Sequence, residues 1–204
     1  MAASRLVSPA NPRGYNTNKF TTPPKTGWSW YNQGGATIDE SGDAILLTTP
    51  AENHYQIRGR TRAFGATKTV VAAVSGFNVL PAGSSGFPEW GVGWTDGTKL
   101  VTISTVLVAS GHGYYIEVHK FTDATTMSVV ANVFFHPGPM PTWIKLRDDG
   151  ANRKAFLSPD EGEHWVEIYS EGRTTFLTAT SHIFMAGGGG GLATTATLRS
   201  WVDS

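Results

Sequence analysis

The chain has 204 residues, of which 40% are hydrophobic and only 16% are charged. This composition predicts a globular domain with a packed core and excludes a disordered chain. The 16 basic residues balance the 16 acidic ones, so no overall field favours nucleic acid, and the absence of cysteine excludes disulfides, thiolate chemistry and Cys-based metal sites.

Residues 1–26 form a polar, proline-rich start to the chain. Pro9, Pro12, Pro23 and Pro24 prevent a regular ladder of backbone hydrogen bonds there. We therefore expect an extended arm before a single domain at 27–204. Two interpretations are open: a loose terminus, or an arm that becomes ordered against a partner.

The sequence carries no sign of export or of membrane insertion. Its start lacks the apolar core of a signal peptide. No apolar run approaches the roughly 20 residues that cross a bilayer. The expectation is synthesis in a host cytoplasm without membrane insertion.

Short β-branched and aromatic segments follow the arm, separated by Gly and Pro at intervals of about 8–12 residues. The strands expected from this pattern are 44–48, 69–74, 100–108, 114–121, 127–135, 143–146, 155–157, 165–169, 183–185 and 196–202. No long segment has helical periodicity, apart from a short turn expected near 175–180. Strands without crossover helices predict an all-β, two-sheet antiparallel β-sandwich.

The run Gly187–Gly191 is the one low-complexity segment. A phosphate-binding loop would need a following helix and a Lys-Ser/Thr pair, and neither is present. We expect a bulge or a close backbone approach before the last strand.

Two motifs carry a resemblance. Trp143-Ile144-Lys145-Leu146-Arg147, a polar turn and then Ser158-Pro159-Asp160-Glu161-Gly162-Glu163-His164-Trp165 resemble a hairpin of concanavalin A-like (laminin G-like) jelly-roll domains, with Glu161 as an extra loop residue. Trp28-Ser29-Trp30-Tyr31-Asn32-Gln33-Gly34-Gly35-Ala36 is similar to the opening of such domains in tailed-phage virion proteins. The resemblance implies a jelly roll in a head-decoration, fibre or tail-fibre protein, and it implies no particular ligand.

Catalysis has little support in the sequence. Glucanases on this fold place paired carboxylates on one strand face. Here Asp39-Glu40 and the carboxylates of 160–163 fall in turns. The six histidines, at 54, 112, 119, 136, 164 and 182, are interpreted as surface or turn residues. No metal site is expected, and a structural Ca²⁺ is unsupported because the turn carboxylates lack an EF-hand register.

Glycan binding is the more serious option. Sugars stack on exposed aromatic rings and accept directed hydrogen bonds. Trp90 and Trp94 share a strand face, and Tyr114 lies beside His112, so these four residues are the glycan-binding candidates. The alternative is that the rings belong to the core.

Arg58, Arg60 and Arg62 alternate along one strand and form a ladder on one face. They are docking candidates for an acidic capsid surface or an anionic glycan, and the arm aromatics Tyr15 and Phe20 are further docking candidates. The structural alternative for the arginines is a charged edge strand that blocks unwanted sheet pairing.

Three functions remain open from the sequence. The first is a non-enzymatic virion structural protein of a tailed phage, a homo-oligomer anchored to other virion proteins through its arm, without a cofactor. The second is a carbohydrate-binding module for cell-surface glycans. The third is a glycoside hydrolase or lyase.

Overall fold

The computed structural model describes residues 19–64, 69–78, 85–108, 113–136 and 142–203, with the backbone alone at 77 and 132–136. His112 and Tyr15, two of the candidates from the sequence, lie outside the described residues. No helix in the described ranges is long and apolar enough to cross a membrane.

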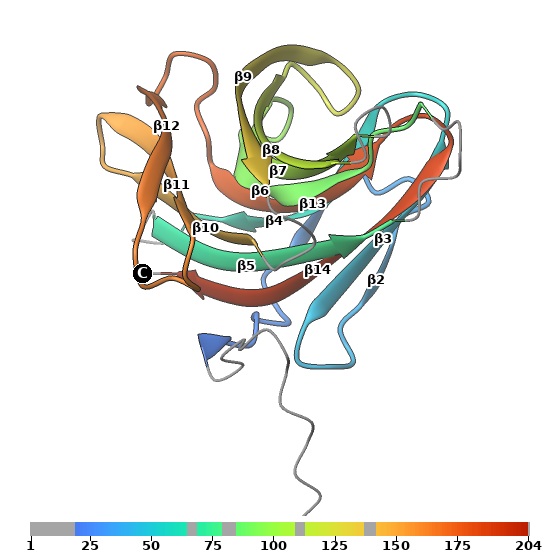
Figure 1. Cartoon of the computed structure of the whole chain (residues 1–204), viewed down its shortest axis with the longest axis horizontal. Helices are drawn as coiled ribbons and strands as arrows, with labels where there is room; N and C mark the ends of the chain where they lie inside the picture. Colours follow the sequence, from blue (N-terminus) through green and yellow to red (C-terminus); the bar gives the residue numbers. More distant parts are fainter. Residues whose placement is uncertain (1–18, 65–68, 79–84, 109–112, 137–141, 204) are drawn as a thin grey trace, which may run out of the picture.

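The described strands form two antiparallel sheets that pack face to face as a sandwich (Figure 1). Sheet A has seven strands, in spatial order β1 (Ser29–Tyr31), β4 (Gln56–Ala63), β13 (Ser181–Gly188), β6 (Glu89–Thr95), β7 (Leu100–Val108), β8 (Gly113–Phe121) and β9 (Met127–His136). Sheet B also has seven, in the order β12 (Val166–Gly172), β11 (Asn152–Ser158), β10 (Thr142–Asp148), β5 (Thr69–Phe77), β14 (Leu192–Asp203), β3 (Ile45–Glu52) and β2 (Thr37–Asp39). The predicted fold class is therefore confirmed.

The main core fills the space between the two sheets. Trp90, Val92 and Trp94 of β6 point towards sheet B, and Val70, Ala72 and Val74 of β5 point towards sheet A. Alternate residues of each strand supply this core, as period-2 patterning requires. The short helical turn expected near 175–180 is absent, since this stretch is turn and irregular chain.

Sheet A is also buried on its outer face, because it is strongly curved. Every residue of β6 is buried, so both faces of this strand are covered. The backbone N–H of Ile57 on β4 donates to the carbonyl of Ala124, in the turn between β8 and β9, over 2.8 Å. This turn thus reaches across the outer face. A second apolar cluster lies beneath it, made of Tyr31, Ile57, Leu100, Phe121, Ile183 and Met185.

The glycine run forms the connection between β13 and β14, as the sequence predicts. Gly188, Gly190 and Gly191 have φ values of 129°, 84° and 74°, which side chains rarely allow. A Cβ on Gly188 would also lie 2.5 Å from the carbonyl oxygen of Phe87. Glycine is therefore required both for the turn and for the close approach.

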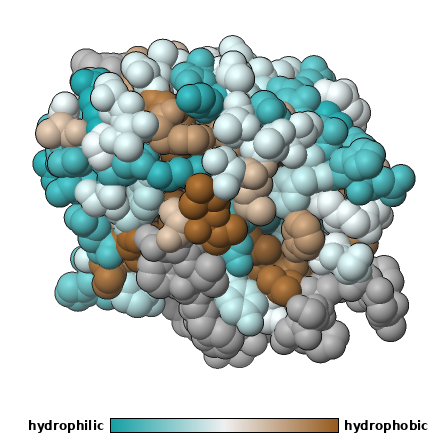
Figure 2. All heavy atoms as spheres, turned by 90° about the horizontal axis from the view of Figure 1, so that it is seen from above, coloured by the Kyte–Doolittle hydropathy of each residue, from teal (hydrophilic) through white to brown (hydrophobic). Residues whose placement is uncertain are grey.

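Few large apolar side chains are exposed among the described residues. They are Phe87, Met127, Val129, Val130 and Val166. Seen from above, the brown apolar residues form separate groups among teal hydrophilic residues and white residues of intermediate hydropathy (Figure 2). The face in this view has no single large apolar patch.

Candidate functional site

The tryptophans predicted to bind glycan are core residues, and this prediction is wrong for both. Trp90 is 2% exposed and Trp94 is fully buried between the sheets. Tyr114 is half-buried and packs edge-on against Trp90, with ring centroids 6.1 Å apart. The period-2 pattern places Trp90 and Trp94 on one face correctly, but that face points into the sandwich. Neither ring can stack on a sugar.

A polar hollow of about 340 Å³ opens instead at one end of the outer face of sheet A. It lies where β1, β4 and β13 meet the turns that join β6 to β7 and β8 to β9. Its lining residues are Trp30, Tyr31, Asn32, Thr61, Thr95, Gly97, Thr98, Asp123, Ala124, Thr180 and Ser181. Five of these carry an aliphatic hydroxyl group, which makes hydrogen bonding the main chemistry of the hollow.

Internal hydrogen bonds hold the rim of this hollow in place. The Tyr31 hydroxyl donates to the carbonyl of Thr98 over 2.6 Å. The Asn32 amide donates to the carbonyl of Ile57 over 2.8 Å, and the Thr95 hydroxyl accepts from the N–H of Gly97 over 2.9 Å. Burial raises the pKa of Tyr31, so its hydroxyl stays protonated. The hollow is thus preformed.

Asp123 is the only carboxylate among the residues lining the hollow. Its Oδ1 accepts from the side-chain hydroxyl and the N–H of Thr125, over 2.7 and 2.8 Å, and from the N–H of Thr126 over 2.9 Å. The hydrogen bonds from Thr125 lower its pKa, so it is charged at neutral pH. Asp123 therefore caps its own turn while it faces the hollow.

A buried ionic cluster lies on the same face of sheet A, deeper in the fold. His119 of β8 bonds to Glu89 of β6 through Nδ1, over 3.1 Å, and to Glu117 of β8 through Nε2, over 2.5 Å. Tyr55 donates its hydroxyl to Glu89. Glu89 is fully buried and His119 is 2% exposed.

The charge state of this cluster follows from its geometry. Burial alone lowers the pKa of His119, but the carboxylates of Glu89 and Glu117 outweigh it and raise the pKa to about 10. His119 is therefore an imidazolium that donates to both carboxylates. Glu89 has no surface through which it can reach a substrate, and both carboxylates are bound to the same histidine. The arrangement ties β6 to β8.

The interpretation of the histidines as surface or turn residues is wrong for two of them. His119 lies in the cluster above, and His182 is 3% exposed between the rings of Phe64 and Trp201. Burial lowers the pKa of His182 to about 4, so it is neutral. His54 and His164 are exposed as expected. Within the described ranges no group of three His, Cys, Asp or Glu residues is arranged to hold a metal ion.

The arginine ladder joins the two sheets. Arg58 pairs with Glu52 of β3, and Arg62 pairs with Asp203 of β14 over 3.0 Å. Arg60 lies 4.8 Å from the centre of the Trp30 ring. The edge-strand interpretation is wrong, because β4 lies between β1 and β13. Arg58 is only 6% exposed, so a docking role for it is also wrong.

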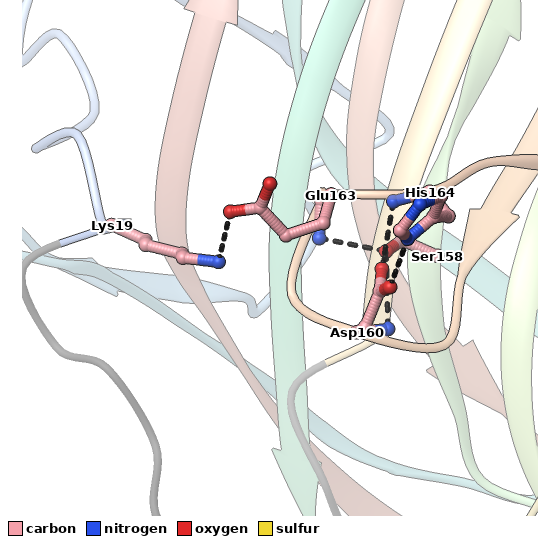
Figure 3. Close-up of polar contacts among 6 residues, drawn as sticks. Lys19, Ser158, Asp160, Glu163 and His164 are labelled. Carbon is pink, nitrogen blue, oxygen red and sulfur yellow. Dashed lines mark hydrogen bonds and ion pairs between the residues drawn. The ribbon is translucent and has the colours of Figure 1, made fainter.

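Phe20, the other described docking candidate, packs within its own chain. Its ring stacks parallel to that of Trp143 on β10, with centroids 5.5 Å apart. Beside it, Lys19 Nζ lies 2.5 Å from a carboxylate oxygen of Glu163, in the loop between β11 and β12 (Figure 3). Residues of the predicted extended arm at 1–26 thus contact the sandwich from Lys19 onward.

The same loop brings Ser158, Asp160 and His164 together (Figure 3). The Ser158 hydroxyl donates to Asp160 Oδ1 over 3.0 Å, while Nδ1 of His164 lies 2.5 Å from Asp160 Oδ2. A nucleophilic serine would need the histidine, not the carboxylate, as its partner. The extra loop residue Glu161 takes a positive φ of 60°. The cluster stabilises the loop that the sequence motif encodes.

The two-sheet topology and the curved sheet A define a concanavalin A-like jelly roll, the fold class expected from the sequence. No family model matches the sequence, and no curated protein matches it.

Several solved structures have a fold similar to that of this chain. The chain is similar to the CBM2 module of the evolved Dit of Lactobacillus casei BL23 phage J-1, with a TM-score of 0.52, 12% identity and coverage of 93% of this chain and 96% of that one. It is similar to the carbohydrate binding module CBM66 from Bacillus subtilis (TM-score 0.51, 13% identity, 88% and 96% covered). It is also similar to a prokaryotic β-1,3-1,4-glucanase derived from a mouse hindgut metagenome, with a TM-score of 0.54, 10% identity and coverage of 88% of this chain and 94% of that one. These similarities show the fold.

Sequence reasoning missed both the hollow and the ionic cluster. The hollow collects one or two residues from each of four strands, β1, β4, β6 and β13, and others from the turns beside them, and no local motif connects them. The sequence does contain one indication of the cluster. Glu117 and His119 stand two residues apart in the strand at 114–121, so both side chains lie on one face. Their partner Glu89 lies 28 residues upstream of Glu117, and only the sheet order brings it close.

Proposed function

We propose that this protein is a non-catalytic carbohydrate-binding domain whose ligand occupies the polar hollow at the end of sheet A. The observation that carries the proposal is the preformed lining of five hydroxyl groups, the Asn32 amide and the Asp123 carboxylate. Sugar hydroxyls both donate and accept hydrogen bonds, and side-chain hydroxyls and amides do the same. The similarity in fold to two carbohydrate-binding modules supports this choice.

The lining also indicates the ligand class. Asp123 gives the hollow a negative charge, and none of its lining residues is basic. A sialylated or uronic-acid glycan would bring a second negative charge beside Asp123, which is unfavourable. The proposed ligand is therefore a neutral oligosaccharide.

Binding without hydrolysis is supported by the carboxylates. Hydrolysis of a glycosidic bond requires a pair of them on either side of the bond. The hollow offers Asp123 alone, and its Oδ1 already accepts three hydrogen bonds from the turn. The pair formed by Glu89 and Glu117 is bound to His119, with Glu89 fully buried. Although the fold is similar to that of a glucanase, the residues that line the hollow do not include the pair of carboxylates that hydrolysis requires.

The test is a glycan array that contains neutral and acidic oligosaccharides, followed by calorimetry on the best ligand. Thr61→Ala combined with Thr180→Ala removes two hydroxyls from the hollow and should weaken binding about thirtyfold, at roughly 1 kcal/mol for each hydrogen bond. Thr180→Trp should abolish binding, because the exposed position tolerates the ring while the ring fills the hollow. Thr178→Ala, which changes an exposed threonine outside the hollow, is the matched control.

Two results would contradict the proposal. One is an array without any bound neutral glycan. The other is a bound glycan whose affinity is the same in the wild type and in the Thr180→Trp variant.

A second proposal concerns where the domain works. We propose that it is a structural component of a tailed-phage virion, a homo-oligomer that contacts other virion proteins through its N-terminal arm. The opening motif at 28–36 and the similarity in fold to a phage Dit module support this proposal. Glycan binding and a place on a virion are compatible, since the hollow and the arm are different parts of the chain.

Light scattering on the full chain and on a chain that begins at Lys19 tests the arm. Lys19 is the right starting point because residues 19–26 pack on the sandwich. A trimer or larger assembly that falls to a smaller mass after truncation would support an assembling arm. Equal masses for the two chains would contradict it.

A further inference from the structure

The hairpin motif of the sequence places a row of three side chains on the outer face of sheet B. Trp143, Lys145 and Arg147 alternate along β10 with residues of the main core. The ring of Phe20 stacks on Trp143, which is only 6% exposed, so this end of the row is closed. Lys145 is half-buried and Arg147 is exposed. The two cations are therefore the part of the row that a ligand can reach.

Two aromatic rings hold the ammonium group of Lys145. Its Nζ lies 4.6 Å from the centre of the Phe156 ring on β11 and 4.6 Å from the centre of the Trp165 ring, in the loop before β12. Phe156 stands directly opposite Lys145 in the register of β10 and β11, and both rings are half-buried. Because a cation is attracted to the faces of aromatic rings, the two rings fix the position of the ammonium group at this surface.

The positive charge of Lys145 and Arg147 is not balanced by a neighbouring carboxylate. Within the described ranges, no ion pair joins either residue to an acidic one, whereas Nζ of Lys154 on the same face lies 3.6 Å from an oxygen of Asp149 and 3.8 Å from one of Glu167. The pKa of Lys145 is lowered, first by burial of its ammonium group and then by the positive charge of Arg147. An anion placed between these two cations would offset their repulsion.

The surface around the two cations indicates the class of ligand. Two residues along a strand span roughly 7 Å, so the long side chains of Lys145 and Arg147 can meet on one acid group. Ammonium and guanidinium groups both bind a carboxylate through charge-assisted hydrogen bonds. Phe156 and Trp165 beside them offer apolar ring surface, on which sugar rings pack. A carboxylate carried by a sugar ring matches both features, whereas a neutral sugar would leave the two charges unbalanced.

We propose that the outer face of sheet B carries a second binding site, for an acidic oligosaccharide whose uronic-acid carboxylate bridges Lys145 and Arg147. The sugar ring packs beside Phe156 and Trp165. The polar hollow opens on the outer face of sheet A, on the opposite side of the sandwich, so the two sites are separate. The inference goes beyond the neutral ligand proposed for the hollow, and either site can exist without the other.

Calorimetry on the full chain tests the site with two probes, a trimer of galacturonic acid and the fully methyl-esterified form of the same trimer. The probes share their sugar rings and differ in charge. The acid should bind, and the ester should bind more weakly by about tenfold or more, since it lacks the charge-assisted hydrogen bonds.

Variants of the two cations identify the site. Arg147→Gln and Lys145→Gln should each weaken binding of the acid by about tenfold or more, and Arg147→Lys, which keeps the charge, should bind more tightly than Arg147→Gln. Arg199→Gln is the matched control and should bind like the wild type. It removes an exposed arginine of the same sheet, which donates to Ser75 over 3.0 Å. If Lys145→Gln fails to fold, Arg147→Gln decides, because its position is exposed.

Several outcomes would overturn the proposal. One is no binding of the acid, or equal affinity for the acid and the ester. Another is equal affinity in Arg147→Gln and Arg199→Gln. Thr180→Trp, which fills the hollow, should leave binding of the acid unchanged, and a loss of binding there would place the acid in the hollow. A trimer of glutamic acid that binds as tightly as the sugar acid would also overturn it, since carboxylates without a sugar would then account for the affinity.

Discussion

The indole ring of Trp90 lies directly against Gly76. A Cβ on Gly76 would stand 2.2 Å from the nearest ring carbon, far inside van der Waals contact. Gly76 belongs to β5 of sheet B and Trp90 to β6 of sheet A, so this contact sets how closely the two sheets approach at that point. A missing side chain on one sheet makes room for the largest side chain on the other.

Gly76→Ala should therefore destabilise the fold by about 1–3 kcal/mol, the usual cost of overpacking a core. Urea unfolding measures the change. Gly42→Ala is the control, since nothing lies within 4 Å of its Cβ position, and it should be close to neutral. With Trp90→Phe as background, Gly76→Ala should cost less, because the smaller ring leaves space. An equal loss of stability in both backgrounds would show that the contact with Trp90 is not the cause of the destabilisation.

His182 should make the protein sensitive to acid. Its pKa is about 4 in the fold and about 6.5 in the unfolded chain, so the unfolded state binds the proton first. The contribution of neutral His182 to the free energy of unfolding is fully present above pH 6.5. It is lost as the pH falls towards 4, and the total loss is about 3 kcal/mol. His182→Gln should show a flatter free energy of unfolding across this window. Parallel curves for the two proteins would contradict the expectation.

His119 should act in the opposite direction. Its pKa is raised to about 10 by its two carboxylate partners, so its contribution is complete below pH 6.5 and is lost as pH rises towards 10. His119→Gln removes one member of a buried ionic cluster and should cost about 3–5 kcal/mol at pH 7. The difference from the wild type should shrink at pH 10. His54→Gln, at an exposed position, should leave the free energy of unfolding unchanged at both pH 7 and pH 10.

The loop between β11 and β12 gives a local titration. The hydrogen bond between His164 and Asp160 lowers the pKa of Asp160 to about 2 and raises the pKa of His164. Asp160→Asn should bring the pKa of His164 back towards 6.5, as followed by NMR titration of its imidazole. Glu163→Gln should have a smaller effect, because Glu163 acts on His164 only through its charge. A His164 titration that Asp160→Asn leaves unchanged would contradict the assigned bond.

The sequence by itself determined the fold class and most of the strands. Alternating β-branched and polar residues fix which side chains share a face, and that information is local. The same holds for the loop at 158–165 and for the glycine run after β13, where particular residues are needed at particular backbone angles. These predictions needed no knowledge of distant partners.

Only the tertiary structure decided which face is inside. Period 2 places Trp90 and Trp94 together but does not state whether that face meets sheet B or solvent, and it faces sheet B. It placed Arg58, Arg60 and Arg62 together equally well, yet only the order of strands shows that β4 is internal and that these arginines join the sheets. The hollow and the Glu89–His119–Glu117 cluster depend on curvature and sheet order, which join residues far apart in the chain. No local pattern encodes such a contact, because its energy arises only after the strands have paired.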